Sequence, residues 1–132
     1  MLLPKKWMAW SIMSVVNCKV QFIRKEGFHT LKEWMADPNH VYIGRPGVVF
    51  IEENGKKERF PKKGSSFCNP FVVGKHGSRE EVIAKYKVYL QARLQAEPEL
   101  ERELKEMKGK KLGCWCHPEP CHGDVLLELL KD

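Results

Sequence analysis

Residues 114–122 concentrate side chains that can act as nucleophiles, bases or metal ligands. This segment holds three of the five cysteines and two of the five histidines of the chain, within the stretch GCWCHPEPCHGD (113–124). Thiolates and imidazoles serve proteins either as reactive groups or as zinc ligands. Which of these chemistries applies depends on the elements that position the side chains.

The cluster is predicted to lie in a turn between a strand at 110–116 and a helix at 122–130. Ligands of open α/β sheets bind at the carboxyl ends of strands, and a helix start there adds free amides and a partial positive charge. We therefore expect Cys121 to be an acidic, nucleophilic thiol, with His122 as its base or orienting partner and Asp124 as a further polar contact. Cys116 and Gly123 complete this hypothetical site.

Two other interpretations use the same residues. Zinc could be held by Cys114, Cys116, Cys121 and His122, although structural zinc sites usually join two well-separated ligand pairs. Alternatively, Cys114 and Cys116 are only buried core residues and the prolines stiffen the turn. The leading hypothesis is a site without a cofactor, and zinc is the alternative.

The rest of the chain alternates strand and helix patterns. We predict strands at 18–23 and 40–44, a hairpin at 47–60 around Asn54-Gly55, and helices at 28–36, 97–107 and from a capping box that starts at Ser78. This order indicates an α/β fold, a small two-layer or three-layer sandwich with a mostly parallel sheet and an inserted β-hairpin. The 132 residues fit a single domain.

The composition of the chain indicates its cellular compartment and the charge of its binding partners. The net charge of +6 favours anionic partners. Five cysteines, three of them within eight residues, suit reduced thiols better than a disulfide framework, so we expect a reducing, cytoplasmic compartment. No apolar run reaches the roughly 20 residues that a membrane helix needs, and residues 1–16 are expected to be structural rather than a signal peptide.

Several short motifs resemble the domain-of-unknown-function family numbered 4326, which is common in bacteriophages and bacteria. They are Arg45-Pro46, Asn69-Pro70-Phe71, Arg79-Glu80 and the closing Cys-x-Cys-x-Pro-x-x-Cys-His-Gly-Asp at 114–124. The resemblance covers about residues 40–130 and supplies no activity. It implies a protein of phage or bacterial type.

The motif residues outside the cluster are polar and lie in loops, where binding residues are often found. Arg45 follows a predicted strand and could grip a phosphate or carboxylate, with a surface ion pair as its alternative role. The Asn69 amide could form hydrogen bonds with a nucleotide base or cap a turn. Arg79 lies in the first turn of a predicted helix, where the helix dipole disfavours a cation unless a ligand or an acid accompanies it. The leading hypothesis is thus an enzyme or ligand-binding protein for an anionic, nucleotide-like small molecule.

A basic run indicates a rival function. It consists of Lys56, Lys57, Arg59, Lys62 and Lys63 on and after the predicted hairpin. These residues either form a solvated surface or contact nucleic acid, and the rival hypothesis is a zinc-bearing nucleic-acid-binding module. A third is a phage or host interaction protein without catalysis.

Overall fold

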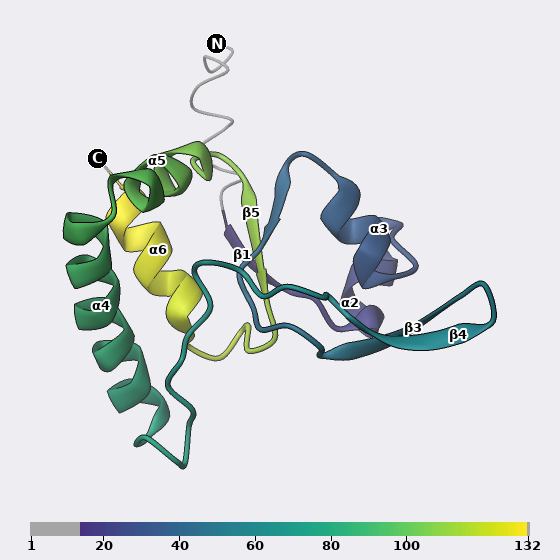
Figure 1. Ribbon diagram of the computed structural model, residues 1–132, viewed down its shortest axis with the longest axis horizontal. Coiled ribbons are helices and arrows are strands. Elements are labelled where there is room, and N and C mark those ends of the chain that lie inside the picture. The colour runs from purple at the N-terminus through teal and green to yellow at the C-terminus, as the bar shows by residue number, and fades with distance from the viewer. Residues whose placement is uncertain (1–13, 132) are drawn as a thin grey trace, which may run out of the picture.

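The computed structural model describes residues 14–131 (Figure 1). The strands are β1 (Ser14–Asn17), β2 (His40–Tyr42), β3 (Val49–Glu53), β4 (Lys56–Phe60) and β5 (Lys111–Cys114). The helices are α2 (Val20–Ile23), the 3-10 turn η1 (Arg24–Glu26), α3 (Leu31–Ala36), α4 (Arg79–Ala96), α5 (Pro98–Glu106) and α6 (His122–Leu130). None of the helices in this range is long and apolar enough to span a bilayer.

The main sheet is parallel and has the strand order β1-β5-β2. Leu112 of β5 pairs with Val15 of β1 on one side and Val41 of β2 on the other, and it is fully buried. Strand β5 therefore occupies the centre of the sheet, between β1 and β2. The α/β class and the mostly parallel sheet predicted from the sequence are confirmed.

Side chains along β5 alternate between two cores. Leu112 and Cys114 face the core under α4, α5 and α6, whereas Gly113 faces the core under α2 and α3. A Cβ on Gly113 would lie 2.5 Å from both Cys18 Sγ and a ring carbon of Trp34, so this close packing requires glycine. Helices thus cover both faces of the sheet, which gives three layers (Figure 1).

The strand predicted at 18–23 is wrong, because these residues begin a short helix. The strand β1 ends at Asn17, whose side-chain oxygen accepts a hydrogen bond from the Lys19 amide at 2.9 Å and turns the chain. Val20 and Phe22, which produced the alternating pattern, lie exposed on α2. Residues 1–13 of the expected structural segment lie outside the described residues, and β1 begins directly after them.

The other predicted elements are confirmed with small shifts at their ends. Helix α3 begins at Leu31 rather than at 28, because the Thr30 hydroxyl caps it by accepting from the Glu33 amide at 3.1 Å. The capping box of Ser78 and Glu81 opens α4 as predicted. The ranges predicted at 40–44, 97–107, 110–116 and 122–130 correspond to β2, α5, β5 and α6.

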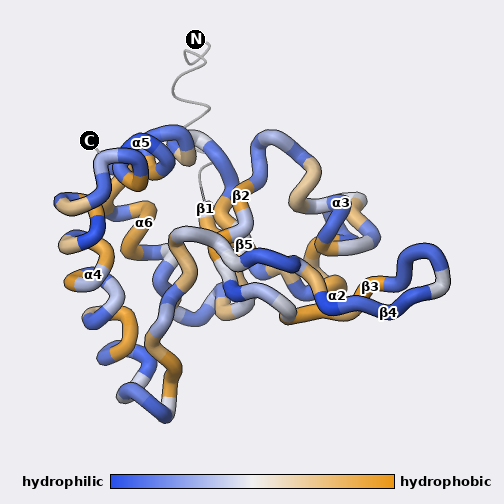
Figure 2. The backbone as a smooth tube through the Cα atoms, in the orientation of Figure 1, coloured by the Kyte–Doolittle hydropathy of each residue, from blue (hydrophilic) through white to orange (hydrophobic). Residues whose placement is uncertain are grey.

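The predicted hairpin is also confirmed. Asn54 and Gly55 form its two-residue turn with φ of 53° and 76°, the pair of positive values that the favoured Asn-Gly turn requires. Strands β3 and β4 pair only with each other within residues 14–131, and they extend away from the body of the protein (Figure 1). Hydrophilic residues dominate β4 and the turn (Figure 2).

Candidate functional site

A pocket of about 430 Å³ opens where β2 and β5 end and where α4 and α6 begin. Six residues of the leading site hypothesis line it together, and so does Cys114 of the zinc alternative: Arg45, Asn69, Arg79, Cys116, Cys121 and His122 are the six. These residues come from positions as far as 77 apart in the sequence, from 45 to 122. The structure therefore brings the predicted strand-end, loop and helix-start residues into one cavity, in the place where α/β sheets usually hold ligands.

Arg45 is held at one wall of the pocket by the turn that follows β2. The Tyr42 hydroxyl donates to the Arg45 carbonyl at 2.8 Å, which fixes the backbone of this turn. The Arg45 guanidinium donates to the Asn69 carbonyl at 2.9 and 3.2 Å and to the Phe71 carbonyl at 3.1 Å. It makes no ion pair with any residue in the range 14–131, so its positive charge is not neutralised by a carboxylate there.

Asn69 caps a turn and still presents a donor. Its side-chain oxygen accepts from the Phe71 amide at 2.9 Å, which is the capping role that the sequence allowed. The side chain is nearly buried, and no hydrogen bond within the described part of the chain engages its Nδ2. The amide nitrogen is therefore left available to a ligand in the pocket.

Arg79 approaches the same cavity from the first turn of α4. Its Nη1 donates to the Pro120 carbonyl at 3.3 Å, which ties α4 to the loop between β5 and α6. Like Arg45, it has no ion-pair partner among residues 14–131, and none of the residues that line the pocket is an aspartate or a glutamate. The pocket thus contains two guanidinium groups and no carboxylate, which favours an anionic ligand.

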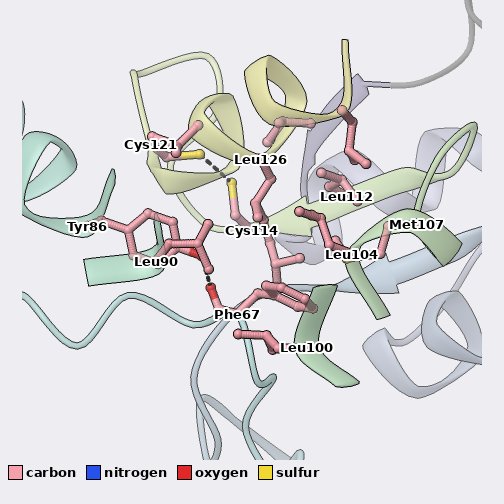
Figure 3. Close-up of a cluster of buried hydrophobic side chains, with 14 residues drawn as sticks. Phe67, Tyr86, Leu90, Leu100, Leu104, Met107, Leu112, Cys114, Cys121 and Leu126 are labelled. Atoms are coloured by element: carbon pink, nitrogen blue, oxygen red, sulfur yellow. Dashed lines mark hydrogen bonds between the residues drawn. The ribbon is translucent and has the colours of Figure 1, made fainter. Parts of the chain in front are cut away.

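Two thiols meet in the wall of the pocket. The Sγ atoms of Cys114, at the end of β5, and Cys121, at the start of α6, lie 3.3 Å apart and face each other among buried apolar side chains (Figure 3). Cys121 is the N-cap of α6, because its Sγ accepts from the Gly123 amide at 3.3 Å while the Asp124 carboxylate accepts from the Cys121 amide at 3.0 Å. This reciprocal cap fixes the position of the sulfur.

The contacts of the two sulfurs differ, and they favour Cys121 as the donor of this pair. The Cys121 thiol and the backbone amides of Cys116 and His117 donate to the Cys114 sulfur, and together they lower the pKa of Cys114 to about 7 despite its burial. The bond to Cys114 and its own burial raise the pKa of the Cys121 thiol. The sequence predicts Cys121 as the thiolate because of the helix dipole, whereas these contacts favour Cys114, so the identity of the thiolate stays a prediction.

His122 is a buried side chain whose surroundings favour the neutral ring. Its Nε2 lies 2.7 Å from the Ile43 carbonyl oxygen, which can only accept, so Nε2 carries the proton. Burial lowers the pKa of His122, the bond to Ile43 opposes this, and the positive charge of Arg45 lowers it further. The lowered pKa of His122 disfavours an imidazolium beside Cys121, and the bond from its Nε2 to Ile43 anchors α6 to the end of β2.

Asp124 and Gly123, which were predicted as site residues, do not line the pocket. Asp124 is exposed, and its carboxylate caps Cys121 as described above. Gly123 is buried, and a Cβ there would lie 2.8 Å from a methyl group of Val15 and 3.0 Å from one of Ile43. Its role in this geometry is to let the first turn of α6 approach the sheet.

The alternative zinc ligands are only partly brought together. Cys114 and Cys121 are adjacent, but in the range 14–131 no three His, Cys, Asp or Glu side chains are arranged to hold a metal ion. His122 already uses its Nε2 on Ile43. The prediction of a site without a cofactor and its zinc alternative both stay untested, and metal analysis of the purified protein would decide between them.

Sequence reasoning missed the apolar half of the pocket. Trp115, Phe71, Val72, Val73, Val82 and Ile83 line it together with the polar residues. The Trp115 indole donates to the Tyr42 hydroxyl at 2.8 Å, which joins the end of β5 to β2. The run Phe71-Val72-Val73 within a loop rich in glycine and proline was the available signal, since loops seldom carry adjacent apolar residues without a surface to cover.

Residues 27–132 match the family described as "Domain of unknown function (DUF4326)". The chain belongs to this family. The match includes every residue that lines the pocket and extends beyond the 40–130 region where the motifs indicated the resemblance. The pocket of this DUF4326 protein is therefore built wholly from the family region.

Two viral proteins are similar to this DUF4326 chain. One is the "Uncharacterized 12.4 kDa protein in nrdA-td intergenic region" of Enterobacteria phage T4, which is 37% identical over 65 residues, covering 49% of this chain and 60% of that protein. The other is the "Uncharacterized protein R718" of Acanthamoeba polyphaga mimivirus, which is 35% identical over 75 residues, covering 51% of this chain and 54% of that protein. The chain thus spans less than two thirds of the length of these relatives. No solved structure matches it.

Proposed function

We propose that the pocket binds an anionic, nucleotide-like small molecule. The observation that carries this proposal is the convergence of Arg45 and Arg79 in a cavity whose lining contains no carboxylate. Both guanidinium groups are held by backbone carbonyls rather than by acids, so they are positioned without being neutralised. An arginine so fixed is suited to bidentate recognition of a phosphate or carboxylate group.

Two helix starts reinforce the preference for an anion. The pocket is bordered by the first turns of α4, which has 18 residues, and α6, which has nine. The partial positive charge at a helix N-terminus favours negative groups within the first turn. Acids in the first turns, Glu80 and Glu81 in α4 and Asp124 in α6, offset part of this contribution, so the two arginines carry the proposal.

The apolar lining favours a ligand that also carries a flat or apolar group. Phe71, Trp115 and Ile83 offer surface for such a group, and Asn69 Nδ2 offers a donor that could bind a base or sugar oxygen. A volume of about 430 Å³ lies within the usual range for sites that bind small molecules. A nucleoside phosphate combines these properties in one molecule.

The thiol pair supplies this site with reactive groups. Cys114 as the thiolate would act as a nucleophile, and Cys121 as the thiol would act as the adjacent proton donor. Both residues line the pocket, and they are 1% and 3% exposed, so a ligand would have to fill the pocket to its wall to reach the sulfurs. The proposal includes an enzymatic role for this pair of thiols. That role requires that the pocket first binds the ligand.

Calorimetric titration with AMP and with adenosine tests the proposal. We expect AMP to bind at least about tenfold more tightly than adenosine, since a charge-assisted contact contributes about 1.5–3 kcal/mol. Arg45→Gln and Arg79→Gln are each expected to weaken AMP binding by about tenfold or more. Protein treated with EDTA is expected to bind AMP as well as untreated protein does.

Arg102→Gln is the matched control, because Arg102 is exposed on α5 and lies outside the pocket. It removes the same charge and is expected to leave AMP binding unchanged. Thermal unfolding of each variant confirms that it is folded. Equal affinities for AMP and adenosine, or equal losses in all three variants, would refute the proposal.

A further inference from the structure

The hairpin of β3 and β4 exposes an aromatic ring on its outer face. Phe50 is 58% exposed, more than any other aromatic side chain among residues 14–131. Its neighbours along β3, Val49 and Ile51, point to the opposite face, and Val49 packs with Phe60 against the core under α2 and α3. One face therefore holds the hairpin to the body of the protein, and the other presents Phe50 to solvent.

Two cations lie over this ring. Arg59 pairs directly with Phe50 across the hairpin, and its guanidinium carbon lies 5.2 Å from the ring centroid. Lys57 stands diagonally opposite on the same face, with its Nζ 5.3 Å from the centroid. Proteins that bind single-stranded nucleic acids combine such aromatic rings with positive charges. A base that stacks on the Phe50 ring would displace a cation from above it, and the displaced Lys57 or Arg59 would then meet a flanking phosphate.

The charge balance of the hairpin favours a polyanion. Of its acids, Glu53 is paired with Lys32 and Glu58 with Lys62. Four basic side chains of this segment make no ion pair within the described residues: Lys56, Lys57, Arg59 and Lys63. Glu52 is the acidic side chain of the segment that is likewise unpaired. The segment therefore presents a net positive surface next to the exposed ring.

We infer that this face, formed by Phe50, Lys57 and Arg59, binds single-stranded nucleic acid. A base must leave its stack to lie on the Phe50 ring, which a single strand allows and a duplex resists. An acidic polypeptide would use the cations but not the face of the ring. The inference goes beyond the proposed small-molecule pocket and does not depend on it.

Fluorescence anisotropy with a labelled strand of about twelve thymidines tests the inference. Phe50→Ala is expected to weaken binding about tenfold, since stacking of one base contributes about 1–3 kcal/mol. The double variant Lys57→Gln, Arg59→Gln is expected to reduce the slope of log affinity against log salt by about 1.4, because each phosphate contact on a single strand contributes about 0.7. These side chains are exposed, so the variants are expected to fold, which circular dichroism checks.

The double variant Arg102→Gln, Lys105→Gln is the matched control, because it removes two exposed cations from α5 instead. It is expected to bind the strand nearly as well as the wild type. An abasic strand of the same length is expected to bind more weakly than the thymidine strand, and to be indifferent to Phe50→Ala. The inference is overturned if the wild type fails to bind the thymidine strand, binds a duplex or polyglutamate more tightly, or loses as much affinity in the control as in the hairpin variant.

Discussion

The ultraviolet absorbance of the folded protein is expected to rise with a midpoint near pH 7 as Cys114 ionises. The pKa of Cys114 is lowered to about 7 because the Cys121 thiol and two backbone amides donate to its sulfur. Thiolates absorb in the far ultraviolet more strongly than thiols do, so a pH titration follows this group directly. Burial raises the pKa of Cys18 to well above this range, so Cys18 stays silent.

Three substitutions assign this transition to one sulfur. Cys114→Ser is expected to abolish it, because the ionising group is gone. Cys121→Ser retains a hydroxyl donor and is expected to keep the midpoint low, whereas Cys121→Ala removes the donor and is expected to move the midpoint upward. A transition that survives Cys114→Ser and disappears in Cys121→Ser would instead place the thiolate on Cys121, as the sequence indicated.

The same pKa determines how stability depends on pH. The pKa of Cys114 is lower in the folded protein, about 7, than its ordinary value of 9.0. Its contribution to the free energy of unfolding is therefore fully present above pH 9 and is lost as the pH falls through 7, with an upper limit of about 3 kcal/mol. Above pH 9 the raised pKa values of Cys18 and Cys121 act in the opposite sense, since their buried thiols must stay protonated. We expect the wild type to gain stability from pH 7 to 9 relative to Cys114→Ser.

Replacing His122 by alanine is expected to lower the free energy of unfolding by about 2–4 kcal/mol. The variant leaves a cavity at the start of α6 and leaves the buried Ile43 carbonyl without its donor. His122→Gln is the matched variant, because its amide can still donate to Ile43, and we expect it to lose less stability. Urea unfolding at pH 8 measures both changes.

The pH dependence of these variants tests the neutral state of His122. Burial lowers the pKa of His122 below its ordinary value of 6.5, so the stability that comes from the neutral ring is present above pH 6.5 and is lost as the pH falls below it. The wild type is therefore expected to lose up to about 1.4 kcal/mol per pH unit in this region from this one group. His122→Gln is expected to show a weaker dependence. Parallel losses in the two proteins between pH 6.5 and 5 would show that His122 is not held neutral by the fold.

Much of the fold could be predicted from short-range signals. Asn54-Gly55 determines the hairpin turn, and the Ser78 capping box marks the start of α4, because both depend only on residues adjacent in sequence. The failure at 18–23 has a tertiary origin. The alternation of Val20 and Phe22 looks like a strand, but Asn17 turns the chain by bonding to Lys19 and, through its Nδ2, to the His117 carbonyl at 2.7 Å. That last partner is a hundred residues away and cannot be read from a local pattern.

The candidate site, like the fold, could be predicted from the sequence only in part. The order of strand, turn and helix at 110–130 predicted that Cys121 would lie near the end of β5, and the motifs added Arg45, Asn69 and Arg79. The location of the thiol proton depends on a 3.3 Å distance between two sulfurs and on the amides that face Cys114. Sequence spacing does not contain these distances, so it favoured the helix-start cysteine over its partner.

Nuclear magnetic resonance of the full chain titrated with AMP tests the central claim most directly, which is that one pocket at the carboxyl edge of the sheet binds an anionic nucleotide. We predict saturable changes in the amide signals of Phe71, Arg79, Cys116 and Cys121, with little change in β4, and a loss of these changes in Arg45→Gln. Changes confined to the hairpin, or none at AMP concentrations that saturate a small-molecule site, would contradict the account.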